Sequence, residues 1–121
     1  MATENFTNDE LRCKCGCGLL PPGAFQIELQ FLRNVYGRPM KLNSAARCPA
    51  YNARVSSTGR KGPHTVGAVD VAVYGQDAVD LIVLAIRHGW YGIGVSQEGP
   101  HESRFVHLDR RPFAQRAVWS Y

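Results

Sequence analysis

The chain is predicted to fold as a small α+β domain, an antiparallel sheet with two or three helices packed on one side. Two stretches have the apolar spacing of amphipathic helices, four short stretches resemble strands, and Gly and Pro separate them throughout. With 121 residues, 45% of them hydrophobic, the chain can bury one core but not two independent ones. We therefore treat residues 1–121 as a single domain.

Two helices are expected. Residues 24–36 carry apolar side chains at intervals of four, three and four, and Gly37 follows as a C-terminal stop. Residues 77–88 have a similar apolar face, and Gly89 ends them. The apolar positions are Phe25, Leu29, Leu32 and Tyr36 in the first helix and Ala78, Leu81, Ile82 and Ala85 in the second.

Strands are expected at residues 40–44, 68–74, 91–96 and 104–109. In the second, Val69, Val71 and Val73 alternate with other residues and should face the core, which directs Asp70 to the opposite side. In the last, Val106 and Leu108 should face the core, so Phe105, His107 and Asp109 share the other face. Residues 47–66 are expected to be a long loop, and loops of that length are often functional.

Composition narrows the choice of partners and of compartment. The net charge of +4 suits an anionic partner, but no aromatic-interleaved basic stripe is present, which argues against nucleic acid. No apolar run approaches the roughly 20 residues of a membrane span. The N-terminus has neither the basic start nor the apolar stretch of a signal peptide. We expect a monomer, made in a bacterial cytoplasm and not inserted in a membrane.

Cys13, Cys15, Cys17 and Cys48 are expected to be reduced, because no secretory signal is visible. The first three are separated by single residues, which is not the usual two-residue spacing of a zinc site. Buried or partly buried free thiols are the favoured interpretation. A second, structural metal on these thiols is the open alternative.

His64, Asp70 and His107 have the chemistry of a zinc site. Two neutral imidazoles and a carboxylate fill three corners of a tetrahedron around Zn²⁺ and leave the fourth for water. That open coordination is typical of a catalytic zinc and favours hydrolysis.

Several further motifs occur in a fixed order along the chain. They are Glu-Asn-Phe-Thr (4–7), Cys-Lys-Cys-Gly-Cys-Gly (13–18), Arg-Cys-Pro-Ala-Tyr-Asn (47–52), Gly-Ile-Gly-Val (92–95) and Phe-Val-His-Leu-Asp-Arg-Arg (105–111). Together with the metal residues they resemble the M15 family of zinc D-Ala-D-Ala carboxypeptidases and peptidoglycan endopeptidases, especially its small phage and prophage members. The resemblance covers nearly the whole chain and implies an α+β domain with zinc on an antiparallel sheet.

The resemblance implies that His64, Asp70 and His107 bind Zn²⁺ and that Arg47 polarises the scissile carbonyl or stabilises the oxyanion. The implied function is a zinc metallopeptidase that cuts peptidoglycan stem peptides, as an endolysin that reaches the wall or periplasm through a holin lesion. D-Ala-D-Ala carboxypeptidase, L-Ala-D-Glu endopeptidase and cross-link cleavage all stay open. The rivals are a non-catalytic, zinc-stabilised wall-binding or virion structural module, and an interaction domain built on a cysteine zinc site.

Two departures from the family pattern lie near the first ligand. Gly62 stands where the family usually has Ser, and His64 and Asp70 are six positions apart instead of the usual seven. A shift of one residue along a strand would turn a side chain to the other face. We expect a tighter turn at Gly67 to keep Asp70 directed at the metal.

The general base is not fixed by the sequence. Many relatives have an acid three positions before the second histidine, where this chain has Arg104. Glu102 and Asp109 are the two candidate bases, and His101 is a third. Asp109 is alternatively a partner that orients His107.

Overall fold

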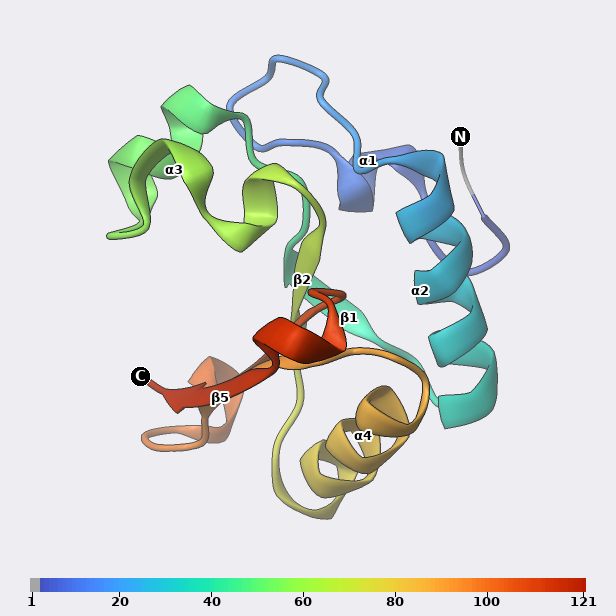
Figure 1. Cartoon of the computed structure of the whole chain (residues 1–121). Coiled ribbons are helices and arrows are strands. Elements are labelled where there is room, and N and C mark those ends of the chain that lie inside the picture. Colours follow the sequence, from blue (N-terminus) through green and yellow to red (C-terminus); the bar gives the residue numbers. More distant parts are fainter. Residues whose placement is uncertain (1–2) are drawn as a thin grey trace.

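A computed structural model describes residues 3–121, and its centre is a five-stranded sheet (Figure 1). The strands lie in the order β1 (Lys41–Ser44), β2 (Ala68–Ala72), β4 (Phe105–Asp109), β3 (Gly92–Ser96) and β5 (Ala117–Ser120). All neighbouring pairs are antiparallel except β3 and β5, which are parallel. The small α+β fold and its four expected strands are confirmed, whereas β5 and its parallel pairing were not predicted.

Two helices cover one face of the sheet and form the core with it. They are α2 (Gly23–Tyr36) and α4 (Gly75–Arg87), each within two residues of its predicted bounds, and Gly37 ends α2 in the left-handed conformation. The buried core combines Leu29, Leu32, Leu81 and Ala85 of the helices with Val69, Val71, Ile93, Val106 and Leu108 of the strands. Within residues 3–121, no helix has the length and apolar character to cross a membrane.

The remaining helices are short. A capping box between Thr7 and Glu10 starts α1 (Asn8–Leu11). The stretch predicted as a loop, residues 47–66, instead contains α3 (Pro49–Val55) and two 3₁₀ turns, η1 (Gly59–Lys61) and η2 (Pro63–Thr65). That prediction was wrong because α3 has little apolar periodicity. In Figure 1, α3 lies on the left, apart from α2 and α4.

The strand registers decide which side chains leave the core. Asp70 of β2 pairs directly with His107 of β4, and Val69 pairs with Leu108. Because successive side chains alternate between faces, Val69 and Leu108 point into the core, whereas Asp70 and His107 lie together on the other face of the sheet. The predicted strand parity is confirmed.

Candidate metal centre and its cavity

His64, Asp70 and His107 meet in one buried cluster. The Oδ1 atom of Asp70 lies 3.2 Å from Nε2 of His64 and 3.0 Å from Nδ1 of His107. The three side chains come from η2, β2 and β4, and one ligand atom of each lies within 4.8 Å of the others. The structure therefore brings together the three residues that the sequence indicated.

The other nitrogen of each imidazole is held by an acceptor. Nδ1 of His64 lies 2.7 Å from the carbonyl oxygen of Ala45, and Nε2 of His107 lies 2.8 Å from Oδ2 of Asp109. Carbonyl and carboxylate oxygens only accept, so these two nitrogens donate. In a neutral imidazole the opposite nitrogen then carries the lone pair. Both lone pairs point to the cluster.

This donor set fits Zn²⁺. Two imidazole lone pairs and a carboxylate oxygen repel one another unless a proton or a metal cation lies between them. A tetrahedral zinc with ligands at about 2.0 to 2.2 Å separates them by roughly 3.4 Å, close to the distances to Asp70. A carboxylate on the far side of a ligating histidine is also the usual support of such a site. His64, Asp70 and His107 are the residues that would hold the metal.

The surroundings keep both carboxylates charged. In the metal-free protein, where a proton instead of a metal lies between Asp70 and the imidazoles, burial opposes the charge of Asp70, but hydrogen bonds from His107 and His64 outweigh it and hold the pKa of Asp70 well below its ordinary value. Burial likewise opposes the charge of Asp109, but hydrogen bonds from Arg111 and His107 lower the pKa of Asp109. For His107, burial is outweighed by Asp109 and Asp70, and its pKa is raised. Without a metal these charges favour a proton on His107, and a bound cation takes the place of that proton.

The short spacing between His64 and Asp70 is accommodated by a tight turn. The backbone N–H groups of Val66 and Gly67 both donate to the carbonyl of Pro63, at 3.1 and 2.9 Å. The chain passes so close to α2 that a Cβ at Gly67 would lie 2.9 Å from the Phe25 ring. The tighter turn expected at Gly67 is present, and Asp70 still faces the cluster.

Arg47 lies beside the cluster, and its role on the substrate stays a prediction. Its Nη2 atom is 3.6 Å from Oδ2 of Asp70, the carboxylate oxygen that does not face the histidines. Its Nε and Nη1 atoms donate to Ser44 and Asn52, each at 3.1 Å. The fully buried Asn52 also bonds Thr58, so it joins Arg47 to the following loop. Sequence reasoning missed Asn52, whose only signal was its place in the Arg-Cys-Pro-Ala-Tyr-Asn motif.

Gly62 is explained by the same loop. A Cβ at this position would lie 2.1 Å from Oγ1 of Thr58 and 2.7 Å from Nδ2 of Asn52. A serine there would displace both groups, so the departure from the family pattern belongs to this chain's own packing.

The cluster opens into a cavity of about 620 Å³. Trp119 and Tyr121 line one wall, since the parallel pairing of β5 with β3 brings the C-terminal residues to the site. The indole of Trp119 lies 5.1 Å from the ring of His107, and the Arg111 guanidinium lies 4.9 Å over the indole. Among the described residues that line this cavity, Asp70 is the only acid.

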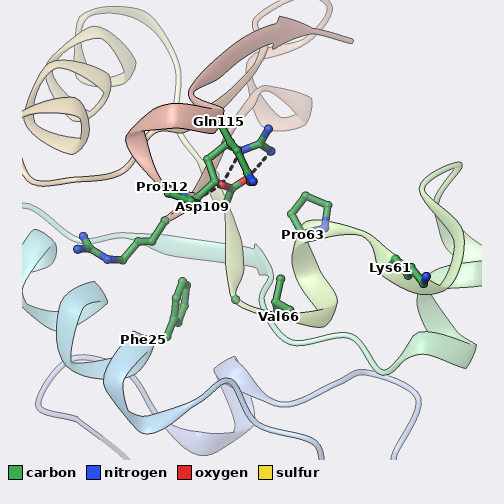
Figure 2. Close-up of a pocket in the computed structure, with 10 residues that line it drawn as sticks. Phe25, Lys61, Pro63, Val66, Asp109, Pro112 and Gln115 are labelled. Carbon is green, nitrogen blue, oxygen red and sulfur yellow. Dashed lines mark hydrogen bonds and ion pairs between the residues drawn. The ribbon is translucent and has the colours of Figure 1, made fainter.

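The two candidate bases lie outside the lining of this cavity. Asp109 belongs to the wall of a neighbouring cavity of about 420 Å³, where Figure 2 shows it with Phe25, Pro63 and Val66 around it. There its carboxylate accepts three bonds from Arg111, two from the guanidinium at 2.9 Å and one from the backbone at 3.1 Å. Glu102 lies exposed on the 3₁₀ turn η3 (His101–Ser103). Arg104, at the family's acid position, bonds the carbonyl of Gly99 and braces that turn.

Two glycines of β3 leave room for the site. Gly92 pairs with Asp109, and a Cβ at Gly92 would lie 2.1 Å from its Oδ1 atom. Gly94 pairs with His107, and a Cβ there would lie 2.7 Å from Nε1 of Trp119. The Gly-Ile-Gly motif is therefore required by the side chains that support and cover the metal ligands.

A family model described as peptidase M15 matches residues 4–109. The chain belongs to the peptidase M15 family. The match contains Arg47, the three ligand residues and both candidate bases, whereas β5 lies beyond it. M15 peptidases use zinc, and the buried cluster of this chain is a metal site of the matching kind, so the chain is a metallopeptidase of that family. No curated protein matches the chain significantly.

Proposed function

We propose that the chain hydrolyses a peptide bond in the stem peptides of bacterial peptidoglycan. The observation that carries this proposal is the charge pattern of the cavity. Two guanidinium groups, those of Arg47 and of Arg111, which Asp109 holds from outside this cavity, lie at the wall, and the one acid among the described lining residues, Asp70, is taken up by the metal site. Such a cavity suits a peptide that carries carboxylates, as stem peptides with D-Glu and a terminal D-Ala do.

A zinc ion held by His64, Asp70 and His107 would supply a Lewis acid for the carbonyl and lower the pKa of water to roughly 7. Arg47 is fixed by Ser44 and Asn52, so its Nη2 group donates to a developing oxyanion or to a substrate carboxylate without reorganising. Trp119 and Tyr121 form the wall against which the peptide lies.

We assign different roles to the two carboxylates. Asp109 is engaged by His107 and Arg111 and belongs to the neighbouring cavity, so it acts as a positioning residue that fixes His107. Glu102 is exposed on η3, and we propose that this turn moves over the bound peptide. Glu102 then accepts a proton from the attacking water and donates it to the leaving amine.

Digestion of purified peptidoglycan, followed by mass spectrometry of the fragments, tests this function. We expect cleavage that is lost on chelation and restored by Zn²⁺, and the fragment masses identify the bond. His107→Ala should abolish cleavage, and His88→Ala at the end of α4 is the matched control that should not. Intact muropeptides under all conditions would exclude the enzyme and favour the zinc-stabilised binding module.

We further propose a phage endolysin role, in which the enzyme is made in the host cytoplasm and reaches the wall through a lesion in the membrane. The net charge of +4 supports contact with an anionic wall polymer. Bacteria that express the chain should lyse only when their membrane is permeabilised, and His107→Ala should prevent that lysis. Lysis that occurs equally with His107→Ala would contradict the proposal.

A further inference from the structure

A second cluster of metal-binding side chains lies outside the hydrolytic site. The sulfur atoms of Cys13, Cys15, Cys17 and Cys48 all lie within 4.8 Å of one another. The Sγ atoms of Cys13 and Cys15 are 3.5 Å apart, and those of Cys15 and Cys48 are 3.7 Å apart. A tetrahedral zinc with four thiolates at about 2.3 Å gives edges of roughly 3.8 Å. The four sulfurs thus have the spacing of a Cys₄ site.

The turn that carries three of these cysteines is shaped to bring them together. Gly16 lies between Cys15 and Cys17, and Gly18 follows Cys17. Their φ angles of 90° and 80° are ones that residues with side chains rarely adopt, and they let the chain turn sharply at the cysteines. The N–H of Cys13 donates to the carbonyl of Leu19 at 2.8 Å and closes the turn. This local geometry explains how the unusual Cys-x-Cys-x-Cys spacing presents three sulfurs to one point.

Backbone donors point at two of the sulfurs. The N–H of Cys48 donates to Sγ of Cys13 at 3.3 Å, and the N–H of Tyr51 donates to Sγ of Cys48 at 3.4 Å. Such bonds favour the thiolate, which is the form that binds metals. The structure corrects one expectation here, because Cys15 and Cys17 are exposed and not buried thiols.

We propose that Cys13, Cys15, Cys17 and Cys48 bind a structural zinc ion, separate from the site of His64, Asp70 and His107. Four soft thiolates select Zn²⁺ over hard cations and leave no open coordination position for chemistry. The proposal does not depend on the peptidase activity.

The position of Cys48 connects the proposed zinc ion to the hydrolytic site. It follows Ala45, whose carbonyl orients His64, and Arg47, which lies beside Asp70. The N–H of Ala46 also donates to the carbonyl of Leu11 at 3.1 Å, so the same segment is already joined to the N-terminal region. A zinc ion on the cysteines fixes residues 45–48 from behind while their other side serves the hydrolytic site.

Metal content of the purified full chain is the first test. We expect two zinc ions per chain in the wild type, one in His64→Ala/His107→Ala and one in Cys15→Ser/Cys17→Ser. Lys14→Ala, in the same turn but without a thiol, is the matched control and should keep two. A wild type with one zinc that the Cys15→Ser/Cys17→Ser variant retains would overturn the proposal.

Cobalt substitution tests the ligands directly, even if the cysteine variant folds poorly. In His64→Ala/His107→Ala, Co²⁺ should produce intense thiolate-to-cobalt charge-transfer absorption, and a thiol reagent should find four thiols per chain after denaturation with a chelator. Absence of that absorption would show that the cysteines are free thiols and would overturn the proposal. A count of two or fewer reactive thiols would show that they form a disulfide, and would overturn it as well.

Discussion

Asp70 uses its two oxygens for different purposes. Oδ1 faces both histidines, whereas Oδ2 lies 3.6 Å from the guanidinium of Arg47. A single carboxylate therefore contributes to the metal seat and also holds the residue assigned to the oxyanion. Removing Asp70 would affect both at once, which makes it uninformative about either function alone.

Asp109 and Glu102 give separable phenotypes. Asp109→Asn should weaken zinc binding about 10- to 100-fold, because His107 loses the carboxylate that orients it. Glu102→Gln should lower kcat about 100-fold or more with unchanged zinc affinity. Competition with a chromophoric chelator and steady-state kinetics measure the two effects. Glu98→Gln, another exposed carboxylate of the same loop, is the control, and equal kinetics for it and Glu102→Gln would remove Glu102 from the mechanism.

Gly92→Ala should damage the site without touching a ligand. The added methyl would lie 2.1 Å from Oδ1 of Asp109, so the carboxylate must move away from His107 and Arg111. We expect a loss of about 1 to 3 kcal/mol in the free energy of unfolding and weaker zinc binding. Thermal unfolding and zinc titration check this. Ser96→Ala on the same strand should change neither, and a Gly92→Ala protein with wild-type zinc affinity would contradict the account.

At the level of elements, β5 builds the cavity wall without supplying a ligand. Trp119 faces His107, while Val118, the next side chain toward the N-terminus, is 73% exposed on the opposite face. Trp119→Ala should raise KM about tenfold or more and leave the zinc content unchanged, since aromatic anchors carry much of the energy of binding. Val118→Ala is the matched control. Kinetics with a muropeptide substrate measure the effect, and a loss of zinc in Trp119→Ala would mean that the strand supports the metal instead.

Periodicity predicted the elements that pack on the core. The spacing from Phe25 to Tyr36 and the alternation around Asp70 and His107 record burial on one side, so α2, β2 and β4 could be located from the sequence. By contrast, α3 and β5 bury little apolar surface: Val118 is exposed and Asn52 is the buried residue of α3. Their positions depend on hydrogen bonds and on pairing with distant strands, which leave no periodic signal.

The site was predicted as far as residue type and parity allow. His64, Asp70 and His107 were found from their chemistry and form one cluster, and the structure brings Arg47 beside them, while the role of Arg47 on the substrate stays a prediction. Strand alternation places Asp109 and His107 on the same face of β4 but does not say which nitrogen of His107 each carboxylate contacts. In the structure Nδ1 faces Asp70 and Nε2 faces Asp109, so Asp109 supports the imidazole from the side away from the other ligands.

For the molecule as a whole, stability should depend on zinc and pH together. In chelator-treated protein the raised pKa of His107 contributes stability that is fully present below its ordinary pKa of 6.5 and is lost as pH rises through the raised value. Zinc must displace that proton, so it binds better as pH rises. The increase in Tm on adding zinc should therefore grow between about pH 5.5 and 8.

Calorimetry at several pH values, with zinc or with a chelator, measures this increase. In Cys15→Ser/Cys17→Ser protein, only the histidine site can contribute to the increase in Tm on adding zinc. Adding His107→Ala to that protein should abolish the increase. An increase that is the same at every pH would show that protons do not compete with zinc at His107.

The two histidines differ in how far their orientation can be changed by mutating other residues. The tautomer of His64 is set by the main-chain carbonyl of Ala45, which no side-chain substitution can delete, whereas that of His107 is set by the carboxylate of Asp109. Asp109 depends in turn on Arg111 and on the space left by Gly92. Random mutagenesis that selects for loss of activity should therefore recover substitutions at Asp109, Arg111 and Gly92, which disturb the acceptor of His107, but none at Ala45 that removes the acceptor of His64. The orientation of His107 depends on a chain of side chains, whereas that of His64 is built into the backbone.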